Sequence, residues 1–174
     1  PGTGPVSHYC WTGAAQGLDP HPLFSSSWYT AALPVEAAIN PLVHYITHQG
    51  RNPPDPHPLF DTDFYLKQVG KIAPGRTPLE DFLARPPGSA IRPNAVFDPV
   101  AYAEEYATSV KDGTNPLAHY AAEGEAGGFW PHPLFNPAWY TARHPAAVEF
   151  GALAHYLREK KCAKGVVCSE HMEQ

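Results

Sequence analysis

Pro131-His132-Pro133-Leu134-Phe135-Asn136-Pro137-Ala138-Trp139-Tyr140 is the stretch that decides the fold, because close copies of it begin at Pro20 and Pro56 and a weaker copy begins at Pro93. Its asparagine is suited to cap a helix, and the proline that follows fits the first helical position, where a missing N–H costs nothing. The phenylalanine before the cap and the tyrosine four residues after it have the spacing of a hydrophobic staple. The other copies keep phenylalanine, cap and tyrosine at Phe24, Ser25 and Tyr29, at Phe60, Asp61 and Tyr65, and at Phe97, Asp98 and Tyr102.

A second motif alternates with the first. It reads Pro41-Leu42-Val43-His44-Tyr45-Ile46, with relatives at 78–83, 116–121 and 152–157. Its aromatic residue recurs at positions 45, 82, 120 and 156, and the tyrosine of the first motif recurs at 29, 65, 102 and 140. Both markers therefore show one period, and a period of this size indicates stacked supersecondary units. The i, i+3, i+4 spacing of Leu42, Tyr45 and Ile46 predicts that all three face the core.

These motifs predict an all-α fold, a right- or left-wound, solenoid-like array of helix pairs with proline-rich loops and about 36–38 residues per unit. In the first complete unit we expect one helix, helix A, over about Ser25 to Leu33 and another, helix B, over about Pro41 to Gln49. We expect a single repeat domain over 1–161, with a partial unit at 1–19, units near 20–55, 56–92, 93–130 and 131–161, and a tail or cap at 162–174.

Composition bounds the function classes. The 174 residues are 43% apolar, and most of the 21 prolines fall at fixed places in the repeat, which favours order over disorder. The net charge of −5, without a basic cluster, argues against a nucleic-acid partner. No apolar run approaches the roughly 20 residues of a membrane span. The chain opens within a repeat and without Met, so we expect a piece of a longer protein, and the compartment stays open.

The three cysteines leave their pairing open. Cys162 and Cys168 could close a small terminal loop as a disulfide, or both could stay reduced. Cys10 occupies the repeat position that Ile46 and Leu83 hold elsewhere, so we expect it to be a buried small hydrophobic residue.

Two sets of histidines recur, one in the loops and one on the second helix of each unit. The loop set is His21, His57 and His132, and the helix set is His44, His119 and His155. The pattern is broken twice, at positions close together in the chain. Asp81 stands where a helix histidine is expected, and Asn94 stands where a loop histidine is expected. This joint loss predicts that a loop histidine contacts a helix histidine, so that acidification through about pH 6 would loosen the loops.

These histidines could also be ligands of a metal ion. Zinc needs three or four ligands about 2.0–2.3 Å from the ion. Equivalent residues on successive packed helices are about 8–10 Å apart, so they cannot share one ion. We therefore expect no metal or other cofactor, and a histidine-based metal-binding protein remains an alternative.

The aromatic residues beside the staple tyrosines carry the other functional signal. Trp28, Phe64 and Trp139 lie one residue before them and could pack on a neighbouring unit or line a surface, burial being the favoured interpretation. Sugars stack on exposed aromatic faces, and protein partners use Trp and Tyr as anchors. These three residues and the six motif histidines are thus the candidate binding residues.

Catalytic motifs are absent from the sequence. It contains no nucleophile elbow, phosphate-binding loop, HExxH motif or dinucleotide fingerprint, and carboxylates such as Glu104 and Glu105 have the pattern of solvated helix faces. Residues repeated in several units serve a fold more readily than a single active site. We therefore expect that the chain is not an enzyme.

The units beginning Pro56-His57-Pro58-Leu59-Phe60-Asp61 and Asn115-Pro116-Leu117-Ala118-His119-Tyr120 resemble a tandem repeat found in or beside bacterial glycosyltransferases and cell-surface polysaccharide-synthesis proteins. The resemblance covers about Pro5 to Lys160 and departs from the pattern at Asp81, Asn94 and Ala101. It implies a non-catalytic binding or assembly module with a protein or carbohydrate partner, and self-assembly is compatible with it. An accessory fragment of a larger enzyme is a further alternative.

Overall fold

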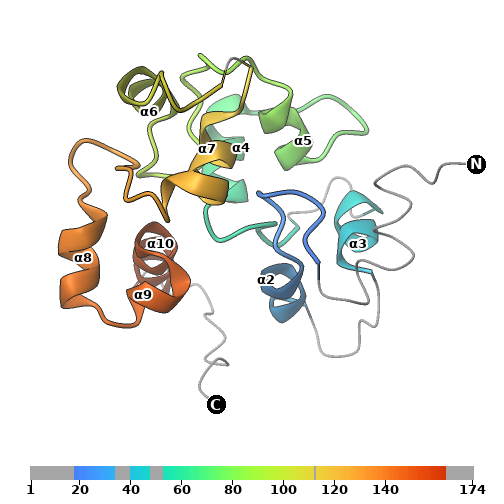
Figure 1. Ribbon diagram of the computed structural model, residues 1–174. Coiled ribbons are helices and arrows are strands. Elements are labelled where there is room, and N and C mark those ends of the chain that lie inside the picture. The colour runs from blue at the N-terminus through green and yellow to red at the C-terminus, as the bar shows by residue number, and fades with distance from the viewer. Residues whose placement is uncertain (1–17, 34–39, 48–52, 112, 164–174) are drawn as a thin grey trace, which may run out of the picture. The chain divides into compact units, whose positions relative to one another are not determined.

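The computed structural model describes residues 18–33, 40–47, 53–111 and 113–163. Within these ranges the chain forms helices, and its only strand-like pairings are isolated bridges in three tight turns, which confirms the all-α prediction (Figure 1). The chain divides into two compact units, Pro1–Pro86 and Pro87–Gln174. The solenoid-like winding of the whole array and the boundaries proposed for its repeats stay predictions.

The first compact unit holds two helix pairs. They are α2 (Ser26–Ala31) with α3 (Pro41–Thr47), and α4 (Thr62–Val69) with α5 (Pro78–Leu83). In each pair the two helices contact one another, as the sequence predicts for helix A and helix B of one repeat. The helices begin close to the predicted caps, and α2 ends two residues before the expected end. The expected end of α3 lies outside the described residues.

The second compact unit holds two further pairs and one helix that the sequence did not predict. Its elements are α6 (Pro99–Glu105), α7 (Pro116–His119), the π-helical turn η2 (Tyr120–Gly124), α8 (Pro137–Arg143), α9 (Ala147–Phe150) and α10 (Ala152–Cys162). The unpredicted α9 fills the link between α8 and α10 and contacts both (Figure 1). Cys162 ends α10 in a disulfide. Its partner, and the predicted burial of Cys10, lie outside the described residues.

Side-chain caps start the helices where the sequence predicts them. The Asp61 carboxylate accepts a hydrogen bond from Phe64 N at 2.9 Å, and the Asn136 side chain accepts one from Trp139 N at the same distance. Thr77 and Glu80 form a reciprocal capping box at the start of α5. Because each cap satisfies N–H groups that have no partner within the helix, these short helices start at defined residues.

Three aromatic rings form the core of each repeat. The staple phenylalanine packs against the staple tyrosine, with ring centroids 5.5, 5.3, 5.2 and 5.5 Å apart in the four copies, which confirms the predicted staple. The aromatic residue of helix B meets the same tyrosine edge-on at 5.6 to 5.8 Å. These triads are Phe24, Tyr29 and Tyr45; Phe60, Tyr65 and Phe82; Phe97, Tyr102 and Tyr120; and Phe135, Tyr140 and Tyr156.

One predicted core position is wrong. Ile46 is exposed, whereas Tyr45 is buried and Leu42 is half-buried. In α3 the Tyr45 ring packs edge-on against Tyr29 of α2, whereas Ile46, the next residue, is 37% exposed. The helical spacing therefore predicted the correct buried face of α3, but it wrongly included Ile46 in that face.

Within each compact unit the two repeats are joined by a hydrogen bond from backbone to backbone. Ser25 N donates to the carbonyl of Pro56 at 2.9 Å, and Asp98 N donates to the carbonyl of Pro131 at 3.2 Å. In both cases the capping residue of one repeat contacts the proline that opens the turn of the next. A proline cannot donate a hydrogen bond, but its carbonyl remains a full acceptor, and here it satisfies an N–H group at a helix start.

The second helices of consecutive repeats are also linked, by side chains. Leu79 N, in the first turn of α5, donates to the Tyr45 hydroxyl at 3.1 Å. Leu153 N, in the first turn of α10, donates to Glu125 Oε1 at 3.4 Å. Gly151 before α10 has φ +85, and a Cβ there would lie 2.4 Å from the Glu125 carboxylate. Glu125, which belongs to the preceding repeat, therefore caps the N-terminus of α10. The absence of a side chain at Gly151 leaves space for its carboxylate.

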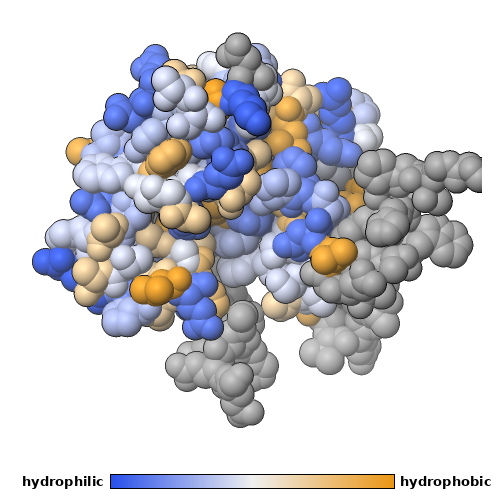
Figure 2. All heavy atoms as spheres, in the orientation of Figure 1, coloured by the Kyte–Doolittle hydropathy of each residue, from blue (hydrophilic) through white to orange (hydrophobic). Residues whose placement is uncertain are grey.

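The surface is mixed in character. On the face shown in Figure 2, hydrophobic residues form small patches separated by hydrophilic ones. Within the described residues no helix has both the length and the apolar character needed to cross a membrane.

Candidate functional site

The loop histidines each close a tight turn. The Nδ1 atoms of His21, His57 and His132 accept hydrogen bonds from the backbone N–H of the leucine two residues later, at 3.0, 3.2 and 3.1 Å. Each histidine carbonyl also accepts from the phenylalanine three residues later at 2.9 Å. A side-chain acceptor at the first position of a turn is the usual role of Asp, Asn or Ser. The imidazole takes that role here, and it can do so only while Nδ1 is unprotonated.

Burial favours the neutral form of two of these turn histidines, His21 and His57. It lowers the pKa of His57 to about 4, with a smaller contribution from the charge of His21. The pKa of His21 is also lowered by burial. Both imidazoles are therefore acceptors at neutral pH.

The helix histidines pair with the staple tyrosines. The hydroxyls of Tyr29, Tyr102 and Tyr140 lie 2.9, 2.9 and 3.0 Å from Nδ1 of the histidine on helix B of the same repeat. Those histidines are His44, His119 and His155. Burial raises the pKa of Tyr29 to about 12 and lowers the pKa of His155. Each of these bonds fastens helix A to helix B of one repeat.

One repeat replaces the tyrosine–histidine pair by an ionic network. The Tyr65 hydroxyl donates to Asp81 Oδ2, while Arg85 donates from Nε to Tyr65 at 2.7 Å and from Nη2 to Asp81 at 2.8 Å. Burial acts to raise the pKa of Asp81, but the hydrogen bonds from Tyr65 and Arg85 outweigh it and lower that pKa. Asp81 therefore occupies the place of a helix histidine and contacts the same tyrosine hydroxyl.

Asn94 replaces a turn histidine in the same direct way. Its Oδ1 accepts hydrogen bonds from Val96 N at 2.9 Å and Phe97 N at 2.8 Å. The predicted hydrogen bond between loop and helix histidines is therefore wrong for their Nδ1 atoms, which bond to backbone in the loops and to tyrosine on the helices. The replacements at Asp81 and Asn94 are two separate local solutions that happen to be close in the chain.

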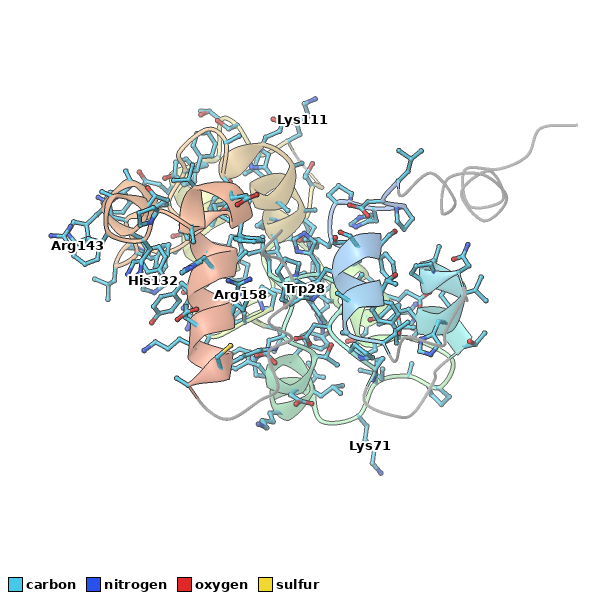
Figure 3. The ribbon with its side chains drawn as sticks, turned by 90° about the horizontal axis from the view of Figure 1, so that it is seen from below. Trp28, Lys71, Lys111, His132, Arg143 and Arg158 are labelled. Atoms are coloured by element: carbon cyan, nitrogen blue, oxygen red, sulfur yellow. The ribbon has the colours of Figure 1, made fainter. Side chains whose placement is uncertain are left out.

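The three candidate aromatic residues are not equivalent. Trp28 and Phe64 are half-buried, whereas Trp139 is 54% exposed. The guanidinium carbon of Arg143, one helical turn later on α8, lies 4.0 Å from the centroid of the Trp139 ring. Arg143 projects outward from this helix in Figure 3. Trp139 is thus the member of this set that can meet a partner.

A fourth aromatic residue, Trp130, stands at a repeat position where the other repeats have a charged side chain that bonds the following helix or its cap. At that position Asp19 and Asp55 accept hydrogen bonds from the first N–H of the following helix at 2.7 and 2.8 Å. Arg92 instead pairs with the cap carboxylate of its repeat at 3.1 Å. Trp130 offers no such group and is 42% exposed. Sequence reasoning missed it, although comparing the residue before each turn proline would have shown the change.

Trp130 lines an open cavity of about 700 Å³ in the second compact unit. The residues around the cavity are Ala101, Tyr102, Glu104, Glu105, Tyr106, Trp130, His132 and Pro133. Ala101 stands where the other repeats have Trp28, Phe64 or Trp139. The cavity therefore lies where one repeat has lost its large aromatic residue and the next has gained an exposed one.

Contacts behind the cavity hold its aromatic wall in place. The backbone N–H of Trp130 donates to the Tyr106 hydroxyl at 2.9 Å. The Tyr106 ring stacks on Phe129 with centroids 4.3 Å apart and planes 6° from parallel. Phe129 in turn stacks on His119, the partner of Tyr102. The tyrosine–histidine pair of this repeat thus supports the cavity from inside.

The polar groups of the cavity come from one helix end and one turn. Glu104 and Glu105 are exposed at the C-terminal end of α6, and the half-buried His132 lies in the turn. The cavity thus combines an indole ring with two carboxylate acceptors. Among the described residues no group of three or more His, Cys, Asp or Glu side chains is placed to hold a metal ion.

Comparison with protein-family models, curated proteins and solved structures gave no match to this chain. The resemblance to the repeat of polysaccharide-synthesis proteins therefore rests on the sequence motifs alone.

Proposed function

We propose that the chain is a non-catalytic carbohydrate-binding module that takes up a neutral glycan in the cavity beside Trp130. The observation that carries this proposal is an exposed indole next to two carboxylates in an open cavity. The resemblance to repeats of bacterial polysaccharide machinery supports the same class of partner. In such a setting the module would hold a glycan for other domains to act on.

The chemistry of the cavity fits a sugar chain. The apolar C–H face of a pyranose ring stacks on an aromatic face, and Trp130 presents such a face at the rim. Sugar hydroxyls can then donate charge-assisted hydrogen bonds to Glu104 and Glu105. An anionic glycan would meet these carboxylates as like charges, which favours a neutral one.

The placement of the acids supports binding without catalysis. Glycoside hydrolysis uses two carboxyl groups that flank the scissile bond. The carboxylates of this cavity are consecutive residues of one helix, and the other lining residues are not acidic. We infer that they orient a ligand and do not cleave it.

The test is calorimetric titration of the protein with neutral hexasaccharides of β-1,4-glucose, α-1,4-glucose and β-1,4-N-acetylglucosamine. We expect at least one to bind, and W130A to weaken it about tenfold or more, equivalent to about 1.4 kcal/mol. A101W should weaken binding as well, because it restores the large side chain that the other repeats carry. W139A removes an exposed tryptophan outside the cavity and should bind as the unaltered chain does. Failure of all three sugars to bind, or full binding by W130A, would overturn the proposal.

A further inference from the structure

The last repeat leaves open a face that is covered in earlier repeats. The turn leucine is fully buried in the first two copies, Leu23 at 0% and Leu59 at 1% exposed, whereas Leu134 is 91% exposed. Leu134 and the exposed Trp139 border a second cavity, of about 380 Å³. The other residues around this cavity are Ala95, Val96, His132, Phe135, Asn136, Tyr140 and Tyr156.

The same repeat carries an unused donor. At two junctions between repeats, one in each compact unit, the capping residue donates its N–H to the carbonyl of the turn proline of the next repeat. The corresponding group of the last repeat is Asn136 N, and it makes no hydrogen bond within the described part of the chain. The open face therefore has an apolar part, and its polar part is the donor that a following repeat accepts at the other two junctions.

The first complete repeat carries the complementary element. The turn prolines Pro56, Pro93 and Pro131 are buried, whereas Pro20 is only half-buried. The carbonyl of Pro20, equivalent to the acceptors at the junctions, makes no hydrogen bond in the ranges that the structure describes. Among the described residues, the first complete repeat thus has an acceptor turn without a donor, and the last repeat has a donor without an acceptor and an exposed apolar face.

We propose that two copies of this chain associate head to tail, with the Pro20–Leu23 turn of one copy seated on the Leu134 and Trp139 face of the other. The contact would reproduce the junction from Ser25 to Pro56 and from Asp98 to Pro131. Because the two surfaces differ, the contact is heterologous and leaves a free end on each outer copy. Longer chains of copies follow as the concentration rises.

Sedimentation velocity over a concentration series tests this association. The unaltered chain should grow in mass with concentration, through dimers to longer species. L134D blocks the apolar face, P20E blocks the turn, and each variant alone should stay monomeric. Mixed in equal amounts, the two should form a heterodimer and nothing larger, because one intact turn then meets one intact face.

The controls separate this association from other causes of assembly or loss. V148D places a charge at another exposed apolar residue, 74% exposed on α9, and should assemble as the unaltered chain does. Circular-dichroism melts should show that L134D and P20E remain folded, since neither position is buried. A monomer at the highest concentration would overturn the proposal and point to a different occupant. Failure of the mixture to pair would also overturn it.

Discussion

At the scale of single residues, one structural task is solved by two chemistries. A staple tyrosine bonds a histidine in three repeats and an Asp81–Arg85 ion pair in the remaining one. In two of the three histidine repeats the residue four positions later is acidic: Glu123 lies 4.0 Å from His119, and Glu159 follows His155, whereas His48 follows His44. After Asp81 that position is basic, and Arg85 pairs with the carboxylate. The two positions therefore vary together among the repeats of Asp81, His119 and His155.

This coupling predicts the outcome of an exchange at Asp81. D81H alone leaves the Arg85 guanidinium beside an imidazole without its carboxylate, so we expect the free energy of unfolding to fall by about 1–3 kcal/mol. The double variant D81H/R85E has the residue pattern of the last two repeats and should recover most of that loss. Urea unfolding of the unaltered chain, D81H, R85E and the double variant forms a complete cycle. Additive losses would show that the two positions act independently.

At the scale of local elements, the Pro-His-Pro-Leu-Phe turn is held by an acceptor that acid can remove. His57 has a pKa of about 4 in the folded chain because it is buried, against an ordinary value of 6.5. Between these values the unfolded chain binds more protons than the folded chain. The stabilisation from this turn is therefore complete above about pH 6.5 and is lost as the pH falls toward 4.

Asn94 supplies the matched variant for this turn. H57N keeps a side-chain oxygen for the backbone N–H groups but cannot take up a proton, so we expect near-normal stability at pH 7. Between pH 7 and pH 5 the unaltered chain should lose more unfolding free energy than H57N, by up to about 1.4 kcal/mol per pH unit. Urea unfolding of both proteins at the two pH values gives this difference. Equal losses would show that His57 does not titrate on unfolding.

The caps, staples and helix pairs of these elements could be predicted because they depend on residues close in sequence. Asn136 and Phe135 stand next to the helix they start, and the period repeats them. The partners of the histidines could not be predicted in the same way. Tyr29 and His44 are 15 positions apart, and their spacing alone does not separate a tyrosine partner from a histidine partner. The short α9 escaped prediction because its segment carries neither motif.

The candidate site was harder to predict than the fold because it depends on departures from the repeat. Ala101 removes a ring and Trp130 adds one, and only the structure shows that both border one cavity. The motif histidines were predicted as binding residues because they recur. The structure shows that they recur because they close turns and join the two helices of a repeat. Trp139 was named from sequence, but its exposure follows from its place in the last repeat.

At the scale of the whole molecule, the same backbone hydrogen bond joins one repeat to the next at two places. The opening proline of a turn accepts a hydrogen bond from the capping N–H of the repeat before it, at Ser25 and at Asp98. The last repeat, at Asn136, has the donor without the acceptor. This difference explains why one end of the repeat series keeps an exposed apolar face.

Amide hydrogen exchange, followed residue by residue by NMR in a dilute, monomeric sample, tests this joint most directly. The amides of Ser25 and Asp98 should exchange slowly, because each donates to a proline carbonyl of the next repeat. The amide of Asn136 should exchange close to the rate of an unprotected peptide. Equal protection at Asn136, or rapid exchange at Ser25 and Asp98, would contradict the account.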